Sequence, residues 1–363
     1  MKILFIAPAN SIHTVRWVNA LAERGHEMHL ACLINHKNMN HDLNDAVTAY
    51  ELPIPGTKGY YLNALKLRKL AAQIKPDVIN VHYASGYGTL MRMAGLKQTL
   101  LSVWGSDVYE FPYQGRLQMH IIRKNLRSAR AIASTSHCMA DQTRAILKEE
   151  REIAVTPFGV NLPEYQEMKK TTSDTMLIGC IKTLEQKYGI NYLIKAIRIL
   201  IDDLQKENKH DIAKKIRCRI YGDGSQKAML QKLIEDLKLE NVVTLMGKIP
   251  HEQVPSTLAE MDIFCVLSEY ESYGVAAVEA SAAGLPVVVS DAPGFKEIID
   301  NSVTGIVVEK KSPEKAAEAL KKLVLNDKLR DSMGKEGRKR VEKLYDWNLN
   351  VSYMEELYHT LRR

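Results

Sequence analysis

The sequence of 363 residues has few cysteines and no long apolar run, and both shortages narrow the class of protein. Its five cysteines form no C-x-x-C pair and are scattered, at positions 32, 138, 180, 218 and 265. Separate thiols favour a reducing compartment over a disulfide framework or a zinc site. No run of 18 apolar residues occurs, and His13, Arg16 and Trp17 soon follow the apolar start, so we expect neither a signal peptide nor a membrane span. These absences predict a cytoplasmic protein.

Low-complexity segments are also missing, and 45% apolar with 26% charged residues is the composition of a globular protein. A chain of this length is expected to form two domains of roughly 150–200 residues each. The formal net charge of +7 is unevenly placed, because residues 1–165 hold 19 Lys or Arg against 13 Asp or Glu and the remainder is nearly neutral. A nucleic-acid-binding protein would account for this charge, but it would need a recognition motif or basic loops interleaved with aromatic residues, and neither is visible. We therefore expect no nucleic-acid partner.

Short apolar runs alternate with amphipathic stretches, which predicts repeated βα units. In the first half we expect strands over residues 2–7, 28–34, 77–83, 99–105 and 131–137. In the second half we expect strands over 176–183, 218–224, 242–248, 262–268, 286–291 and 305–309, and helices over 192–207, 227–237, 274–283 and between 313 and 345. Repeated βα units give parallel sheets covered by helices. The predicted fold class is therefore α/β, with two facing Rossmann-like, doubly wound parallel-sheet domains and a cleft between them.

The segment 153–175 loses helical periodicity and is rich in Pro, Gly, Lys, Thr and Ser, so we interpret it as the interdomain linker. The expected domains are residues 1–165 and 174–346. A final amphipathic helix, 347–363, is expected to pack back on the first domain. Ligands of open α/β sheets bind beyond the carboxyl ends of the strands, which is where candidate residues are expected.

Residues 268–299 are the most informative stretch. A strand ends at Leu267, and a polar turn leads through Gly274 into an Ala-rich helix. The N–H groups at such a helix start, where glycine allows close approach, form a site for a phosphate. Glu279 lies two turns into the helix, where a carboxylate can accept hydrogen bonds from a vicinal diol such as ribose. A capped helix with two solvated glutamates, Glu271 and Glu279, is the alternative interpretation.

Glu271 and Glu279 form the pattern E-x7-E, and the strings AGLPVVVSD and GFKEII follow them. Together these residues resemble the signature of family 4 glycosyltransferases, which are retaining enzymes with the GT-B fold, and the resemblance extends over nearly the whole chain. It implies that residues 1–165 bind the acceptor and that residues 174–346 bind a nucleotide sugar. It also implies transfer of a hexose or N-acetylhexosamine from a nucleotide-diphosphate sugar, expected to be UDP-linked, to a polysaccharide, glycolipid or lipid-linked saccharide.

The resemblance also assigns roles to side chains of the second half. Lys182 and Lys187 match an element that holds the diphosphate, and two solvated surface lysines are the alternative. Glu271 would hold hydroxyl groups of the donor sugar, and Glu279 would hold the ribose. The other donor-binding candidates are Ser272, Tyr273, Gly274, Gly222, Gly294, Phe295 and Glu297. Phe295 stands in place of the second glycine of a Gly-Gly-x-x-Glu segment of the family.

The candidates of the first half lie at expected strand ends. The acceptor-side candidates are Asn10, Ser11, His13 and Trp104. Helix capping is the alternative role for Ser11. His82 and Asp107 suit acceptor positioning and proton transfer, and a structural histidine is an equal alternative for His82. Trp104 stands where many family members carry a histidine that contacts the donor sugar, so His82 or Asp107 would take over that role.

Residues 116–130 place five basic side chains at helical spacing, opposite an apolar side that includes Leu117. These basic residues are Arg116, His120, Arg123, Arg127 and Arg130. An ordinary solvated helix face explains such a stripe. The functional alternative is contact with anionic lipid headgroups or a lipid diphosphate. The expected location is therefore cytoplasmic, or peripheral on the inner face of the cytoplasmic membrane.

The expected mechanism uses no metal and no cofactor, because no D-x-D cluster lies at a strand end. Charge on the departing phosphate would be met by Lys182, Lys187 and the amides near Gly274. No carboxylate is placed as a covalent nucleophile, which favours a same-face attack in which the leaving phosphate takes the acceptor proton. A nucleotide-sugar epimerase of the GT-B fold would show more carboxylates and histidines in its cleft. A non-catalytic sugar-nucleotide-binding protein would show no donor turnover.

Overall fold

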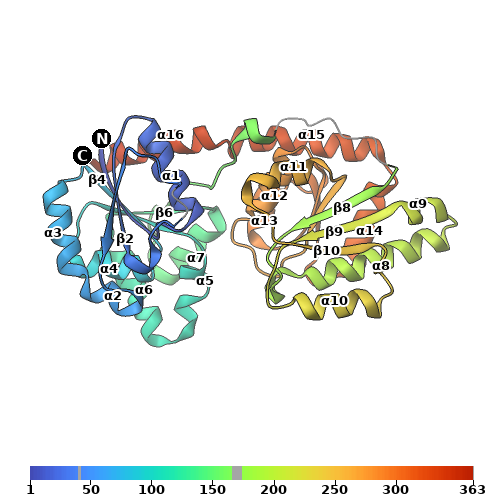
Figure 1. Cartoon of the computed structure of the whole chain (residues 1–363), viewed down its shortest axis with the longest axis horizontal. Helices are drawn as coiled ribbons and strands as arrows, with labels where there is room; N and C mark the ends of the chain where they lie inside the picture. Colours follow the sequence, from blue (N-terminus) through green and yellow to red (C-terminus); the bar gives the residue numbers. More distant parts are fainter. Residues whose placement is uncertain (40–41, 166–173, 363) are drawn as a thin grey trace. The chain divides into compact units, whose positions relative to one another are not determined.

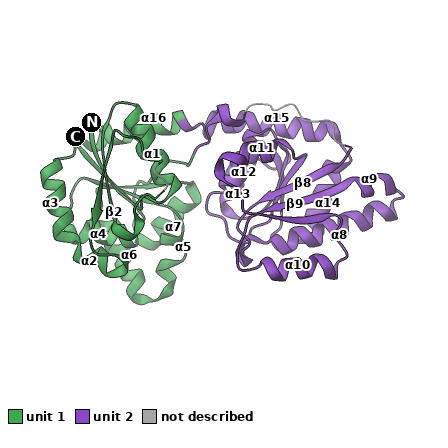
Figure 2. Cartoon of the chain, viewed as in Figure 1, with its two compact units in different colours: residues 1–158, 348–363 green, residues 159–347 purple. Residues whose placement is uncertain are grey.

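The computed structural model describes residues 1–39, 42–165 and 174–362 and divides the chain into two compact units (Figure 1, Figure 2). The first unit comprises residues 1–158 and 348–363, and the second comprises residues 159–347. The first stretch therefore ends before residue 165, where the sequence-based boundary had been expected. Residues 166–173 of the expected linker lie outside the described residues.

The first unit is built on a parallel sheet of seven strands in the order β3-β2-β1-β4-β5-β6-β7. The strands are β1 Lys2–Ile6, β2 Glu27–Leu33, β3 Val47–Leu52, β4 Val78–His82, β5 Thr99–Val103, β6 Ala131–Ser134 and β7 Ala154–Val155. Strands β3 and β7 were not predicted. β3 is an edge strand with three exposed side chains, and β7 has only two residues and lies within the expected linker. The order reverses between β1 and β4, which places the switch point of the sheet at their carboxyl ends.

Four helices of the first unit bury apolar side chains against one face of this sheet: α3 Ala64–Ile74, α4 Gly86–Ala94, α6 Arg116–Ser128 and α7 His137–Leu147. Leu67 of α3, Leu90 of α4 and Leu126 of α6 share a core with Ile79 and Val81 of β4. The remaining elements of the unit are α1 Ile12–Glu23, α2 Gly56–Leu62, α5 Ser106–Tyr109, α16 Trp347–Arg362 and the 3-10 turns Ile34–His36 and Phe111–Gln114. Figure 1 shows α1 and α16 together on the side of the sheet away from α4 and α6.

Helix α16 is fixed to the opposite face of the sheet by a buried polar network. Asn80 lies between Ile79 and Val81 in β4, so its side chain points to the other face. There its amide nitrogen donates to the hydroxyl oxygen of Tyr358 (2.6 Å), while the hydroxyl of Ser102 donates to its carbonyl oxygen (3.1 Å). All of these groups are buried, so each needs a partner inside the protein.

Replacing Tyr358 by phenylalanine is expected to destabilise the first unit by about 1–3 kcal/mol, because the Asn80 amide would stay buried without its oxygen acceptor. Tyr353→Phe on the same helix is the matched control, since Tyr353 is exposed and its change should stay within about 0.5 kcal/mol. Urea unfolding followed by tryptophan fluorescence, to which the buried Trp17 of this unit contributes, measures both variants. Equal effects of the two substitutions would show that the Tyr358 hydroxyl does not anchor the helix.

The second unit is built on a parallel sheet of six strands in the order β10-β9-β8-β11-β12-β13. The strands are β8 Met176–Ile181, β9 Ile216–Tyr221, β10 Val243–Gly247, β11 Ile263–Val266, β12 Val287–Ser290 and β13 Gly305–Val308. The helices are α8 Ile190–Lys206, α9 His210–Lys215, α10 Lys227–Asp236, α11 Val254–Ala259, α12 Val275–Ala282, α13 Pro293–Ile298, α14 Pro313–Val324 and α15 Asp327–Leu344. Three 3-10 turns complete the unit: Leu162–Tyr165, Gln186–Tyr188 and His251–Gln253. All six strands match the predicted runs of the second half.

The charged stretch 313–345 forms two helices because a cap interrupts it. The side chain of Asn326 accepts a hydrogen bond from the N–H group of Leu329 (3.0 Å), which begins α15 directly after α14. In the described part of the chain, no helix is long and apolar enough to cross a membrane.

Candidate functional site

Lys182 and Glu271 are brought together at the carboxyl ends of the neighbouring strands β8 and β11. The Lys182 Nζ atom donates to the Glu271 Oε2 atom (2.6 Å), and both side chains are largely buried. The same ammonium group lies 4.3 Å from the centre of the Tyr188 ring, where a cation interacts with the ring face. The two residues that the sequence places 89 positions apart therefore form one charged pair.

Lys187 is exposed and reaches the same aromatic ring from the other end of the loop. Its Nζ atom lies 5.4 Å from the centre of the Tyr188 ring. Its carbonyl oxygen accepts a hydrogen bond from the N–H group of Glu269 (2.8 Å). This bond ties the loop 182–189, called the lysine loop below, to the segment that carries Glu271. Both predicted diphosphate-binding lysines thus flank Tyr188, a residue that the sequence reading had not assigned.

Helix α12 is preceded by its N-cap residue Gly274, which has a positive φ of 98°. A Cβ atom at Gly274 would lie 2.8 Å from ring atoms of Phe295, so both the backbone conformation and the packing require glycine. The first N–H groups of a helix have no carbonyl of that helix to bond. The turn therefore presents donors and the positive end of the helix dipole close to Glu271 in the chain.

Gly294 and Phe295 pack against this turn. The N–H group of Gly294 donates to the carbonyl oxygen of Glu271 (3.0 Å), and that of Phe295 donates to Ala292 (3.0 Å). A Cβ atom at Gly294 would lie 2.6 Å from the backbone nitrogen of Tyr273, and the Phe295 ring is buried. Both residues were expected to bind the donor, but their N–H groups are bonded inside the protein, so the structure gives them a packing role at this turn.

Gly222 has a packing role of the same kind. Its φ is 148°, and a Cβ atom there would clash with the carbonyl oxygen of Lys182. The N–H group of Lys182 donates to the carbonyl oxygen of Tyr221 (2.9 Å), so the end of β9 holds the start of the lysine loop. Gly222 therefore positions Lys182.

Glu279 is buried in α12 and faces a histidine that the sequence reading missed. The distance from its Oε1 atom to the His251 Nε2 atom is 3.2 Å. His251 follows the edge strand β10 and opens the turn His251–Gln253. Its position just after a strand end was the available sequence signal, but a single histidine in a loop carries little weight.

The remaining donor-binding candidates are Ser272 and Tyr273, in the turn before α12, and Glu297 in α13. Ser272 precedes Tyr273, whose ring is buried and lies 6.1 Å from that of Tyr345. The carbonyl oxygen of Glu297 accepts hydrogen bonds from the Arg340 guanidinium (2.8 Å) and from the Tyr345 hydroxyl (3.3 Å). The backbone of Glu297 is thus fixed to α15 and the residue that follows it.

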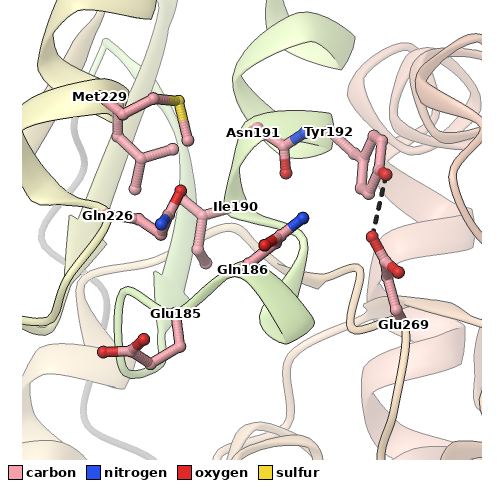
Figure 3. Close-up of a pocket in the computed structure, with 9 residues that line it drawn as sticks. Glu185, Gln186, Ile190, Asn191, Tyr192, Gln226, Met229 and Glu269 are labelled. Atoms are coloured by element: carbon pink, nitrogen blue, oxygen red, sulfur yellow. Dashed lines mark hydrogen bonds between the residues drawn. The ribbon is translucent and has the colours of Figure 1, made fainter.

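A pocket of about 200 Å³ lies between the lysine loop, α8 and α10 (Figure 3). It is lined by Glu185, Gln186, Ile190, Asn191, Tyr192, Gln226, Met229, Leu230 and Glu269. Figure 3 shows the Tyr192 hydroxyl donating to Glu269, at 2.9 Å, and Lys311 holds the other oxygen of that carboxylate at 2.9 Å. Lys182, Glu271 and Glu279 do not line it, so this pocket is separate from the candidate donor site.

Asp107 of the first unit is buried and bonded to backbone. Its carboxylate accepts the N–H groups of Ala84 (2.8 Å), Gly105 (2.9 Å) and Trp104 (3.1 Å). Burial raises the pKa of Asp107, and these hydrogen bonds oppose the rise. The carboxylate holds the loops after β4 and β5 together, and this structural role corrects its expected role in acceptor positioning and proton transfer.

His82 is only 1% exposed and lies in an aromatic cluster formed by Phe5, His13, His82, Tyr83, Trp104 and Phe158. Its ring centre is 4.8 Å from those of Phe5 and Trp104. Neither of its ring nitrogens has a hydrogen-bond partner among the described residues. Burial, together with the charge of His13, lowers the pKa of His82 to about 3, so the ring is neutral at physiological pH. Burial therefore favours the structural alternative for His82 over the expected role in acceptor positioning and proton transfer.

The acceptor-side candidates separate into two groups. His13 stacks on Phe158 with ring centres 4.0 Å apart, and Trp104 meets both rings edge-on. Asn10 and Ser11 instead shape the loop before α1, since their N–H groups donate to the carbonyl oxygens of His36 (3.1 Å) and Pro8 (3.2 Å). Sequence reasoning did not foresee that Phe158 joins His13 and Trp104.

The basic stripe at residues 116–130 is partly structural. Arg123 donates to the carbonyl oxygen of Ile146 (2.7 Å), and Arg127 donates to that of Leu147 (3.2 Å) and pairs with Glu149 (2.7 Å). These two arginines therefore satisfy the last carbonyls of α7. Leu117, expected on the apolar side, is 65% exposed.

Metal ligands do not converge anywhere in residues 1–39, 42–165 and 174–362, where no group of three or more His, Cys, Asp or Glu side chains has a suitable arrangement. The buried position of Cys180, Cys218 and Cys265 raises their thiol pKa values, which disfavours the thiolate that binds metals.

Two parallel sheets, each wound with helices in the Rossmann manner, define a protein of the GT-B class. Sucrose-phosphate synthase from Thermosynechococcus elongatus superimposes with a TM-score of 0.82 at 18% identity, over 99% of each chain. The Anabaena protein HepE, in its complex with UDP-glucose, gives a TM-score of 0.78 at 16% identity, over 99% of this chain and 100% of that one. Similarity at such low identity establishes the fold.

The family follows from the sequence. The family model for glycosyl transferases group 1 matches residues 163–340, and the model described as glycosyl transferase 4-like matches residues 2–136. N-acetyl-alpha-D-glucosaminyl L-malate synthase of Bacillus anthracis is 25% identical over 366 aligned positions, covering 94% of this chain and 91% of that protein. The chain belongs to the group 1 glycosyltransferases, and the enzyme is a glycosyltransferase.

Proposed function

We propose that this enzyme transfers a hexose or N-acetylhexosamine from a UDP-linked sugar, with retention of the anomeric configuration and without a metal ion. The observation that carries the proposal is the Lys182–Glu271 pair at the carboxyl ends of β8 and β11, in the chain segment that leads into α12. A cation, a carboxylate and a helix start are the groups that a sugar diphosphate requires. The nucleotide is proposed as UDP because HepE was solved with UDP-glucose.

Lys182 and Lys187 are proposed to neutralise the charge that builds on the departing diphosphate. Both ammonium groups lie over Tyr188, so they are held within one small area. The N–H groups at the start of α12 add fixed dipoles of the same sign. These groups would act where charge develops, which is the most effective form of electrostatic catalysis.

Glu271 is proposed to hold the sugar and Glu279 the ribose. Glu271 is fixed by Lys182 and by the backbone bond from Gly294 to its own carbonyl. Glu279 is buried with His251 beside it, so a bound diol would meet a carboxylate already oriented by the imidazole. A donor hydroxyl that bonds these carboxylates would gain charge-assisted hydrogen bonds.

Retention is proposed to follow from attack on the same face as the leaving diphosphate. Glu271 already binds an ammonium group at 2.6 Å, which makes it a weak nucleophile and suits it to positioning. The acceptor proton would pass to the leaving phosphate oxygen as the bond from C1 to that oxygen breaks and the bond from C1 to the acceptor oxygen forms. The anomeric configuration of the isolated product, read by NMR coupling constants, tests this step, and an inverted product would refute it.

The acceptor is proposed to be a lipid-linked saccharide, a glycolipid or a polysaccharide at an anionic membrane surface. Support comes from the excess of basic residues in the first 165 positions. L-malate appears in the name of the relative from Bacillus anthracis, so an experiment should compare it, as a small acceptor, with the lipid-linked acceptors.

The test is nucleotide release from a panel of UDP-, GDP- and ADP-linked sugars, each with L-malate, a lipid diphosphate or no acceptor. We expect release from a UDP-linked hexose or N-acetylhexosamine, faster with the lipid acceptor. Lys187→Ala and Glu279→Ala should abolish it while circular dichroism stays unchanged, and Lys214→Ala, in the exposed ion pair with Asp211, should not alter it. Wild-type turnover in both folded site variants would refute the site.

The same panel separates the alternatives. Appearance of an epimeric nucleotide sugar without an acceptor would identify an epimerase. Tight binding of a nucleotide sugar without release in any arm would identify a binding protein.

A further inference from the structure

Much of the basic excess of the first unit lies in one stretch of the sequence. Between Glu51 and Asp77 the sequence has five Lys or Arg and no Asp or Glu. Over residues 52–130 there are twelve Lys or Arg against three Asp or Glu, so this part alone exceeds the net charge of the whole chain. One of the three acids, Asp107, is buried and bonded to backbone. The helices of this stretch, α3, α4 and α6, all pack on one face of the sheet.

Large apolar side chains are exposed at the junction of α2 and α3. Tyr61, Leu62 and Leu65 are 40%, 62% and 68% exposed. Lys58 and Leu62 lie four residues apart in α2, and Leu65 and Lys69 lie four residues apart in α3, so each pair shares one face of its own helix. Two exposed leucines flanked by lysines form an apolar and basic surface, which we call the α2–α3 surface: Lys58, Tyr61, Leu62, Leu65, Lys66 and Lys69.

The α2–α3 surface is a rigid part of the fold. Asn63, between the two helices, is buried and donates to the carbonyl oxygen of Ile54 (2.8 Å). Arg68 donates to the carbonyl oxygen of Ala94 (2.7 Å), which joins α3 to the end of α4. Leu67 on the inner side of α3 is fully buried. Leu65 therefore faces outward because α3 is anchored through its other side.

The lysines of the α2–α3 surface are available to a partner. Lys58, Lys66 and Lys69 are exposed and form no ion pair within the part of the chain that the structure describes. An approaching surface would meet only positive charge between positions 53 and 76. The chemistry that complements it is anionic with an apolar layer beneath, which is the interface of an anionic lipid bilayer.

We propose that the α2–α3 surface docks this enzyme on anionic lipid bilayers, with Leu62 and Leu65 entering the interface and Lys58, Lys66 and Lys69 facing the headgroups. In this orientation the Tyr61 ring would lie in the headgroup region of the bilayer, where aromatic rings with a polar end are favoured. The inference rests on the proposed function only in that a lipid-linked acceptor would lie in the same bilayer. It moves the membrane contact away from the stripe at 116–130, where Arg123 and Arg127 are committed to α7.

Nucleic acid is the other polyanion that such charge attracts. Proteins bind it through lysines, arginines and stacked aromatic rings, whereas aliphatic side chains contribute little to contacts with a phosphate backbone. Leu62 and Leu65 would gain nothing there, whereas a bilayer would bury them. The two leucines therefore favour lipid.

Co-sedimentation with vesicles tests the proposal. The wild-type protein should bind vesicles of phosphatidylcholine with about 30% phosphatidylglycerol at about 0.1 M salt, bind pure phosphatidylcholine weakly, and lose binding as salt screens the charges. The triple variant Lys58→Gln, Lys66→Gln, Lys69→Gln should lower the partition coefficient on the order of a hundredfold, at about fivefold for each lysine. The double variant Leu62→Ser, Leu65→Ser should lower it by about tenfold or more.

Matched controls come from the second unit. Lys322→Gln, Lys328→Gln and Lys335→Gln together remove the same charge from exposed positions of α14 and α15. Leu325→Ser with Leu344→Ser removes two exposed leucines, 38% and 40% accessible. Both controls should keep wild-type partitioning within about threefold, since none of these side chains belongs to the α2–α3 surface.

Three results would overturn the proposal: no binding of the wild type to anionic vesicles, equal losses in test and control variants, or insensitivity to the leucine pair. Binding to a duplex DNA fragment tests whether the partner is nucleic acid. If the protein binds this fragment more tightly than it binds anionic vesicles, and if that binding depends on the lysines but not on the leucines, the proposal is overturned. Nucleotide release without vesicles is measured in parallel and should be unchanged in every variant. An enzyme that binds vesicles but turns over no sugar nucleotide would refute the proposed function and leave the docking surface standing.

Discussion

Replacing Lys182 by alanine is expected to lower the turnover of the donor by about 100- to 1,000-fold, the effect of removing one electrostatic group from a charge-stabilising site. Two losses combine in this variant. The departing diphosphate loses a cation, and Glu271 is left largely buried without its partner at 2.6 Å. The measurement is kcat from nucleotide release with the donor that the panel identifies, and each tenfold loss corresponds to about 1.4 kcal/mol of the barrier.

The pairing of the two side chains makes a sharper test than either substitution alone. Glu271→Gln should also reduce kcat, and the double variant Lys182→Ala, Glu271→Gln should lose little more than the worse single variant, because residues that act as a unit are not additive. Lys195→Ala, at an exposed position of α8, is the control and should keep wild-type kcat. Single-variant losses below threefold, or losses that simply multiply in the double variant, would show that the pair does not act as a unit.

The sequence singled out Lys182 and Glu271 as site residues, although not as an ion pair, because each belongs to a local pattern with a physical basis. A strand followed by a polar turn and a glycine-started helix places Glu271 near fixed N–H donors. The lysine loop follows another strand, and parallel strands bring their carboxyl ends to one edge of the sheet. His251 also follows a strand, but it belongs to no such local pattern, and only the fold brings it to Glu279.

Glycines and arginines show a second limit of prediction from the sequence. Gly222 and Gly294 were assigned to the donor, but the space that a Cβ atom would need is filled by protein backbone. A glycine required for packing and a glycine required by a ligand leave the same letter in a sequence. In the sequence, Arg123 and Arg127 belong to a predicted basic surface. The structure shows instead that they donate to the last carbonyl oxygens of α7.

Lowering the pH below about 6.5 is expected to destabilise the first unit through His82. In the unfolded chain this imidazole takes up a proton near its ordinary pKa, whereas burial and the charge of His13 lower its pKa to about 3 in the folded protein. Because the unfolded state then binds the extra proton, the contribution to the free energy of unfolding is full above pH 6.5 and falls by about 1.4 kcal/mol per pH unit below it. By pH 4.5 the loss is about 2–3 kcal/mol, and it levels off below pH 3.

His82→Leu should remove this pH-dependent loss without lowering stability at neutral pH, because the leucine replaces two ring nitrogens that have no partner among the described residues. Urea unfolding at pH 7.5, 6.0 and 4.5, followed by tryptophan fluorescence, measures the slope. His120→Gln is the matched control, since His120 is exposed on α6 and should leave the slope unchanged. A His82→Leu protein whose stability falls with acid as steeply as the wild type would place the titrating group elsewhere, and would show that the imidazole takes up its proton within the folded aromatic cluster.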